Sequence, residues 1–216
     1  MTIQTCFMIG DENVQYFGHY VDIDPKETEY LMISFSPTNI PIQQRWRNNG
    51  LSADFIAGYM LNFFVVDNEP KAISKNRFVA VKYIANELLE NAMKFHSECK
   101  NSSVTIRFHL LEDQVVFYVR NNIDENRVAV FKEYITKLLN ANPHDLYFQQ
   151  MEINAAHAGH HSGLGFLSIL CDYPARLGWK FESDCPQMHW VTTRVALFLW
   201  EIQAKQNETV FFLRSV

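Results

Sequence analysis

The chain has 216 residues, of which 48% are hydrophobic and 20% charged, so it is apolar enough to bury the core of one domain and is not intrinsically disordered. Its 19 basic and 24 acidic residues give a net charge of −5 without a basic tract, which does not favour nucleic-acid binding. The four cysteines form no C-x-x-C pair, and no apolar run approaches the about 20 residues that span a bilayer, so we expect a cytoplasmic protein with reduced thiols.

The N-terminal part of the chain is predicted to form a strand and a helix. Residues 30–36 are apolar enough to favour a strand, which Pro37 ends because proline lacks the N–H group that a sheet needs. The polar stretch 43–50 is expected to be a connection. Ser52 is then predicted to cap a helix that continues to about residue 64.

The middle of the chain is predicted to contain a long helix and then a β-hairpin. Apolar residues recur every three or four positions from about 74 to 96, which is typical of an amphipathic helix. The stripe expected to be buried consists of Val81, Ile84, Leu88, Ala92 and Phe95. Residues 103–110 and 114–120 alternate in polarity around a polar turn and therefore predict an antiparallel hairpin.

The C-terminal half is predicted to hold helices at 128–139, 143–150 and 164–173, and strands at 178–182 and 190–200. Residues 209–213 are a candidate for an added edge strand. Strands and helices come in runs, without strict β-α-β alternation. The pattern therefore favours an α+β two-layer sandwich, with a mixed, mostly antiparallel sheet and helices on one face.

Three polar side chains share one stripe of the predicted long helix. Glu87, Asn91 and Lys94 stand at positions i, i+4 and i+7, which fall on the same side of a helix. A carboxylate can polarise a hydroxyl, an amide suits a hydrated divalent cation, and an ammonium suits phosphate. An ordinary solvent-exposed helix surface remains the alternative for each of the three.

Two glycines stand where a loop runs into the predicted helix at 164–173. Gly163 and Gly165, with Leu164 between them, form a G-x-G segment. Backbone N–H groups at such a helix start form an anion site. Together with the polar stripe, this segment predicts a nucleoside-triphosphate pocket.

In this order, E-x-x-x-N-A at 87–92 and G-x-G at 163–165 resemble the N box and the G2 box of the GHKL superfamily. This superfamily includes gyrase B, histidine-kinase catalytic domains and the anti-sigma-factor serine kinases. The chain is most similar to the small SiaB-like kinases. The resemblance covers about residues 76–200 and implies a Bergerat-type ATP-binding fold. Residues 1–75 would then be a strand–helix elaboration packed on this core and 201–216 a C-terminal extension, within one structural domain.

The resemblance also implies roles for individual residues. Glu87 would orient or deprotonate the attacking hydroxyl, Asn91 would bind Mg²⁺, and Lys94 would contact a phosphate of ATP. The G-x-G segment would surround the phosphates with N–H groups. Thr193 enters the last long strand much as a family threonine does near the adenine.

The G1 box of the family, D-x-G-x-G, is missing. After the strand at 114–120 the chain reads Asn-Asn-Ile-Asp without a glycine. In place of the missing aspartate, Asn121 or Asn122 would hydrogen-bond the edge of the base, and we assign this role to Asn122. Without this box, another adenine-containing cofactor, FAD, is an alternative ligand, and its ring system would pack on aromatic side chains. The candidates are Trp46, Phe166 and Trp179.

The histidines His157, His160 and His161 are interpreted as part of the lid that precedes the G2 box in this family. A metal site is not expected there, because no acidic or cysteine partner stands at ligand spacing.

The resemblance implies a cytoplasmic, homodimeric regulator that binds ATP and Mg²⁺ and phosphorylates a serine or threonine of a small STAS-type partner protein. Neither a nucleic acid nor a membrane is expected as a partner. Two alternatives stay open. One is a non-catalytic sensor that binds a nucleotide or FAD and acts by protein–protein contacts. The other is a plain α+β interaction domain in which the N-box pattern is coincidental.

Overall fold

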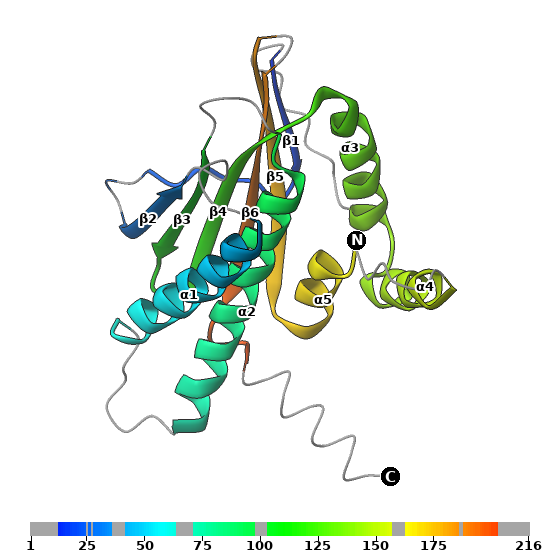
Figure 1. The fold of residues 1–216 in the computed structure, drawn as a ribbon. Helices are drawn as coiled ribbons and strands as arrows, with labels where there is room; N and C mark the ends of the chain where they lie inside the picture. Colours follow the sequence, from blue (N-terminus) through cyan, green and yellow to red (C-terminus); the bar gives the residue numbers. More distant parts are fainter. Residues whose placement is uncertain are drawn as a thin grey trace, which may run out of the picture.

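The computed structural model describes residues 13–24, 26, 28–35, 42–63, 71–97, 103–156, 163–185 and 188–202. Within these ranges, five helices cover one face of a six-stranded open sheet (Figure 1). All the strand pairs that these residues form are antiparallel. The protein is therefore an α+β two-layer sandwich, and the predicted fold class is confirmed.

The order of the strands places two of them at the edges of the sheet. The strands are β1 (Val14–Gly18), β2 (Glu29–Phe35), β3 (Val104–Leu110), β4 (Gln114–Ile123), β5 (Ala175–Cys185) and β6 (Met188–Phe198). The helices are α1 (Ile42–Leu61), α2 (Lys71–Phe95), α3 (Glu125–Asn140), α4 (Pro143–Ala156) and α5 (Gly165–Asp172). The sheet order is β1-β5-β6-β4-β3-β2, so β4 and β6 are central and β1 and β2 are the edges.

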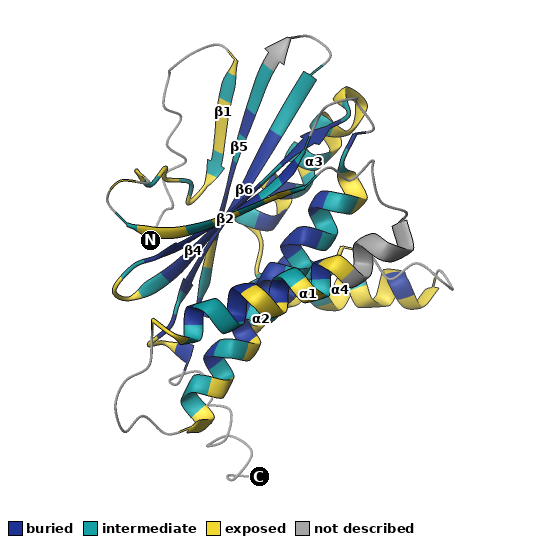
Figure 2. Cartoon of the chain, turned by 60° about the vertical axis from the view of Figure 1, so that its left-hand side comes forward, coloured by how far each residue is buried: buried dark blue, intermediate teal, exposed yellow. Residues whose placement is uncertain are grey.

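Alternation along the central strands divides the two faces of the sheet. Val115, Phe117 and Val119 of β4 lie in the main core beneath the helices, whereas Val116 and Tyr118 belong to a smaller cluster on the opposite face. The helices show the same division, with buried residues on the sides toward the sheet and exposed residues on their outer sides (Figure 2). The hydrophobic core therefore lies between the two layers.

Among the element boundaries that differ from the sequence prediction are the start of α1 and the end of β4. α1 begins at Ile42, so the predicted connection at 43–50 is helical and Ser52 lies inside the helix. Glutamine and arginine in this stretch are good helix formers, and α1 packs along α2. β4 continues through Asn121 to Ile123, because these residues pair in register with β6. This pairing outweighs the poor strand propensity of asparagine.

The buried stripe predicted for α2 is confirmed at four positions and wrong at the fifth. Val81, Ile84, Leu88 and Ala92 are buried. Phe95 is 40% exposed, because α2 ends at this residue and its side chain lines the cavity described below.

Several predictions concern parts of the chain outside the described residues. They are the candidate strand at 209–213, the histidines at 157, 160 and 161, and the side chain of Trp46. Among the helices that the structure does describe, none combines the length and the apolar character that crossing a membrane requires.

Candidate functional site

A cavity of about 600 Å³ opens between the helices and the sheet, a size typical of a small-molecule site. It is lined by residues of α2, α3, α5, β4 and β6, together with Gly163. The polar and charged members of the lining are Asn91, Lys94, Asn121, Arg127, Tyr134 and Thr193. The remaining lining is apolar or glycine, so the cavity offers a mostly apolar surface with a few polar groups.

Five residues of the predicted site line this one cavity. Asn91 and Lys94 come from α2, Gly163 and Gly165 from the start of α5, and Thr193 from β6. Burial of Ile84, Leu88 and Ala92 fixes the rotation of α2 about its axis, and this rotation directs the polar stripe to the cavity. Three segments that are distant in the sequence therefore meet at one place.

Gly165 lies against the carboxylate of Glu87. A β-carbon at this position would overlap a carboxylate oxygen of Glu87 and would stand 3.5 Å from Nδ2 of Asn91. Glu87 does not itself line the cavity, but this contact places its carboxylate where α2 meets the first turn of α5. Burial raises the pKa of Glu87, and the nearby charge of Glu90 raises it further.

Gly163 adopts a backbone conformation that only glycine accepts readily. Its φ angle is +86°, and a β-carbon there would approach the side chain of Gln150 to 3.3 Å. Its carbonyl accepts a hydrogen bond from the hydroxyl of Tyr134 (3.3 Å). Leu164 precedes the first helical residue of α5, and its carbonyl accepts the N–H of Ser168 (2.7 Å). Leu164 does not line the cavity.

The two asparagines of β4 lie on opposite faces of the sheet. Asn121 lines the cavity, and its Nδ2 donates to the carbonyl of Asn122 (3.0 Å), which leaves its amide oxygen as the acceptor for a ligand. Asn122, which the sequence analysis assigned to the base, is buried away from the cavity, and its Nδ2 donates to the carbonyl of His189 (2.9 Å). The two-residue period of a strand explains why only one of the two reaches the cavity.

Aromatic residues form one side of the cavity. Phe131 stacks on Tyr134 and on Phe166, with ring centroids 6.4 Å apart in both pairs. Trp179 is fully buried behind Phe166 and does not line the cavity. The sequence motifs pointed to Phe166 but not to the residues of α3. Arg127, Val130, Phe131 and Tyr134 are spaced i, i+3, i+4 and i+7, which marks one side of a helix, although the predicted helix began only at residue 128. This spacing alone does not show that the side faces a cavity.

The charged groups that line the cavity are both cations. Lys94 and Arg127 stand over the ring of Phe95, at 5.3 Å and 6.0 Å from its centroid. Arg127 also lies 3.8 Å from a carboxylate oxygen of Asp124. The described residues contain no group of three histidine, cysteine or carboxylate side chains that would hold a metal ion by itself. The lining therefore favours an anionic ligand.

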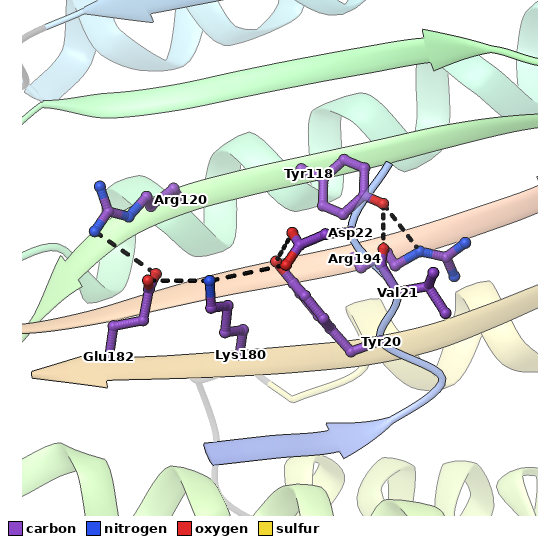
Figure 3. Close-up of polar contacts among 8 residues, drawn as sticks. All are labelled: Tyr20, Val21, Asp22, Tyr118, Arg120, Lys180, Glu182 and Arg194. Carbon is purple, nitrogen blue, oxygen red and sulfur yellow. Dashed lines mark hydrogen bonds and ion pairs between the residues drawn. The ribbon is translucent and has the colours of Figure 1, made fainter. Parts of the chain in front are cut away.

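The opposite face of the sheet carries a separate polar network, which belongs to the segment after β1 (Figure 3). Tyr118 donates to the carbonyl of Val21, and Arg194 donates to Tyr118 (3.4 Å). Lys180 pairs with Glu182 (3.1 Å) and with Asp22 (3.9 Å). This network holds the segment across the sheet and has no part in the cavity.

In comparisons with known proteins, no family model matches the chain, and no curated protein matches it.

Proposed function

We propose that this protein is a GHKL-type signalling regulator that binds ATP and Mg²⁺ and phosphorylates a serine or threonine of a small STAS-type partner. The observation that carries the proposal is the convergence of Asn91 with Gly163 and Gly165 at one cavity. These are the positions of the N box and the G2 box in the resemblance, and they lie far apart in the sequence. The cavity lies between helices and sheet, which is where the resemblance expects the nucleotide.

The charge and shape of the cavity support a nucleotide as the ligand. Lys94 and Arg127 supply positive charge for a polyphosphate. Gly163, just before α5, and Gly165, its first residue, carry no side chain, so backbone N–H groups at the start of the helix can approach an anion. The apolar floor between β4 and β6 suits a base, with the oxygen of Asn121 placed to accept a hydrogen bond from an exocyclic amine.

Glu87 is the proposed catalytic group. Burial raises the pKa of its carboxyl, which makes the carboxylate a stronger proton acceptor. We assign it to orient the partner's hydroxyl and to take its proton as the oxygen bonds to the terminal phosphorus of ATP. The bond from that phosphorus to the bridging oxygen breaks in the same transfer, and ADP leaves. Phosphoryl transfer depends mainly on such positioning and on the neutralisation of charge.

Asn91 fits a role in holding Mg²⁺, because an amide oxygen is a hard ligand and magnesium takes its other ligands from phosphates and water. When bound, the ion would neutralise charge on the phosphates. The carboxylate of Glu87, one helical turn away on α2 and just outside the cavity lining, is a second oxygen donor nearby.

One observation favours a second candidate, a sensor that binds FAD and acts without catalysis. Four aromatic side chains line the cavity, and an amide stands where the family places the carboxylate that reads adenine. An isoalloxazine ring stacks well on such a surface. The four residues are Phe95, Phe131, Tyr134 and Phe166.

Ligand-dependent melting of the purified protein tests the proposal. ATP with Mg²⁺ at a hundredfold excess over its Kd stabilises the folded state by about 2.7 kcal/mol, which raises the melting temperature of a domain of this size by about 5–10 °C. Asn91→Ala is expected to abolish this rise. The matched control is Asn86→Ala on the same helix, because Asn86 donates to Glu90 (2.8 Å) outside the cavity.

The possible results separate the candidates. If ATP with Mg²⁺ leaves the melting temperature unchanged, the proposal is wrong. Stabilisation by FAD together with absorbance in the flavin band would establish the second candidate instead. Stabilisation by neither ligand would favour the plain interaction domain.

A further inference from the structure

Three aromatic rings stand in a row along the side of the cavity that α3 and α5 form. They belong to Tyr134, Phe131 and Phe166, and the planes of neighbouring rings meet at angles of 15° and 20°. Phe166 is buried in the main hydrophobic core, and Phe131 also meets the ring of Phe181 edge to face at 5.9 Å. The row is therefore anchored at the core, and this anchoring fixes where the ring of Tyr134 lies.

The fixed ring brings a hydroxyl to the G-x-G segment. The hydroxyl of Tyr134 donates to the carbonyl of Gly163 at 3.3 Å, and both residues line the cavity. Burial raises the pKa of this phenol to about 12, so the hydroxyl keeps its proton at neutral pH and can donate. The distance exceeds the about 2.8 Å that is usual between two hydrogen-bonded oxygens, so the bond can still shorten. The stacked ring thus presents a donor, as well as an apolar surface, to the loop before α5.

Gly163 is contacted by α4 as well. Its α-carbon lies against the side chain of Gln150, so that a β-carbon would stand 3.3 Å from the amide carbon. Nε2 of Gln150 donates to Oδ1 of Asn154 (3.1 Å), which is buried. α4 packs on α5, and Figure 1 shows α3 and α4 on the same side of α5. Two helices outside the sequence motifs therefore place the first glycine of the G-x-G segment.

The direction of the Gly163 carbonyl matters to an anion in the cavity. A carbonyl oxygen carries partial negative charge and repels a phosphate, whereas the N–H groups at a helix start attract one. Leu164, the residue before α5, has no side-chain acceptor to cap these N–H groups, so a ligand can take this place. A peptide group is planar and trans, so a Gly163 carbonyl that points toward α3 turns the N–H of Leu164 the opposite way. The hydrogen bond from Tyr134 therefore sets the direction of this peptide group.

We propose that Tyr134 is a positioning residue of the phosphate site. Its hydroxyl holds the carbonyl of Gly163 turned toward α3, so that the phosphates meet N–H groups at the start of α5 and not this carbonyl oxygen. The inference rests on the proposed function, because it concerns the phosphates of the nucleotide bound there. It adds a residue that neither the N box nor the G2 box contains, from a helix that lies outside both.

A glycine needs such a restraint more than another residue does. Gly163 adopts its φ of +86° at little cost, and the same freedom lets the peptide group that follows it rotate. Without the hydroxyl, the carbonyl of Gly163 can turn into the cavity and oppose a phosphate. Removing the hydroxyl should therefore weaken the binding of the phosphates and leave the binding of the base unchanged.

The test compares ligands with and without phosphates, in the full chain and in its variant Tyr134→Phe, which keeps the stacked ring and removes only the hydroxyl. Calorimetry measures the Kd of ATP with Mg²⁺, and ligand-observed NMR measures that of adenosine. In the variant we expect the Kd of ATP with Mg²⁺ to rise about three- to tenfold, as for the loss of one hydrogen bond, and that of adenosine to change less than about twofold. The matched control is Tyr147→Phe on α4, which lies outside the cavity lining and should leave both constants unchanged.

Thermal melting by circular dichroism checks that both variants are folded. Equal affinity of wild type and Tyr134→Phe for ATP with Mg²⁺ overturns the positioning role and leaves the proposed function standing. A loss that is the same for ATP and for adenosine also overturns this role, because Tyr134 would then only shape the cavity. If wild type does not bind ATP with Mg²⁺, the proposed function is wrong, and this inference falls with it.

Discussion

The contact between Gly165 and Glu87 provides a direct test of the site, through the single change Gly165→Ala. The new β-carbon would overlap a carboxylate oxygen of Glu87, while its 3.5 Å distance to Asn91 is ordinary contact. The obstacle is the end of a flexible side chain, so α5 need not move. The carboxylate is instead displaced from the place where it would meet a ligand.

The expected cost to stability is small because two effects oppose each other. Forcing the Glu87 side chain off its rotamer costs about 0.5–1.5 kcal/mol. Alanine in place of glycine within a helix contributes about 0.5–1 kcal/mol. The free energy of unfolding should therefore change by less than about 1 kcal/mol. Affinity for ATP with Mg²⁺ should fall more, by about tenfold or about 1.4 kcal/mol, because a methyl group and a displaced carboxylate both intrude at the phosphates.

The assay is a binding titration with thermal unfolding, done in wild type and in a Glu87→Ala background. In that background the overlap is gone, so Gly165→Ala should lose most of its effect on affinity, as expected of a coupled pair. Gly50→Ala on α1 is the control, since its β-carbon meets nothing within 4 Å and should only stabilise the helix. An unchanged affinity in Gly165→Ala would refute the placement of the phosphates. A loss of several kcal/mol of stability in both backgrounds would show that Glu87 is not the obstacle.

Three further outcomes follow from the same geometry. Glu87→Gln should retain nucleotide binding and abolish phosphorylation of the partner, since it keeps the shape and removes the base; wild-type activity in this variant would exclude Glu87. Gly163→Ala should lower the free energy of unfolding by about 1–2 kcal/mol, because its φ of +86° is unfavourable for alanine, and denaturant titration beside Gly50→Ala measures this. Burial and the charge of Arg107 lower the pKa of His109 from 6.5 to about 4, so the folded state keeps the ring neutral while the unfolded state takes up a proton. The stability that the neutral ring contributes is complete above pH 6.5 and is lost as the pH falls toward 4, at up to about 1.4 kcal/mol per pH unit. His109→Gln should therefore make the free energy of unfolding depend less steeply on pH in this range. Parallel curves of unfolding free energy against pH for the two proteins would contradict this expectation.

Periodicity in the sequence was sufficient to predict the layers and most elements, because the apolar residues of α2, β3 and β4 repeat at helix or strand spacing. It failed at the start of α1, where Asn48, Asn49 and Gly50 look like a connection but packing against α2 makes them helical. It also failed at Asn121, since only the ladder to β6 shows that this residue belongs to a strand.

For the site, the sequence motifs identified residues of α2, α5 and β6 that line one cavity. The motifs did not show which side chains of β4 and α3 face the cavity. A strand's alternation decides that Asn121, and not Asn122, faces the cavity. Arg127 and Tyr134 join the lining because α3 lies beside α5, and no local pattern states which helices are neighbours.

The extension of β4 through its two asparagines affects which parts of the site can move. Asn121 and Asn122 are rungs of a ladder with β6, and the N–H of Ser97, just after α2, donates to the carbonyl of Asn122 (3.0 Å). The strand floor of the cavity and the end of α2 thus belong to one hydrogen-bonded unit, whose amides should exchange slowly with deuterium whether or not a ligand is present. Slower exchange on binding is then expected at α3 and around Gly163. Ligand capture would close one wall of the site onto a floor that is already rigid.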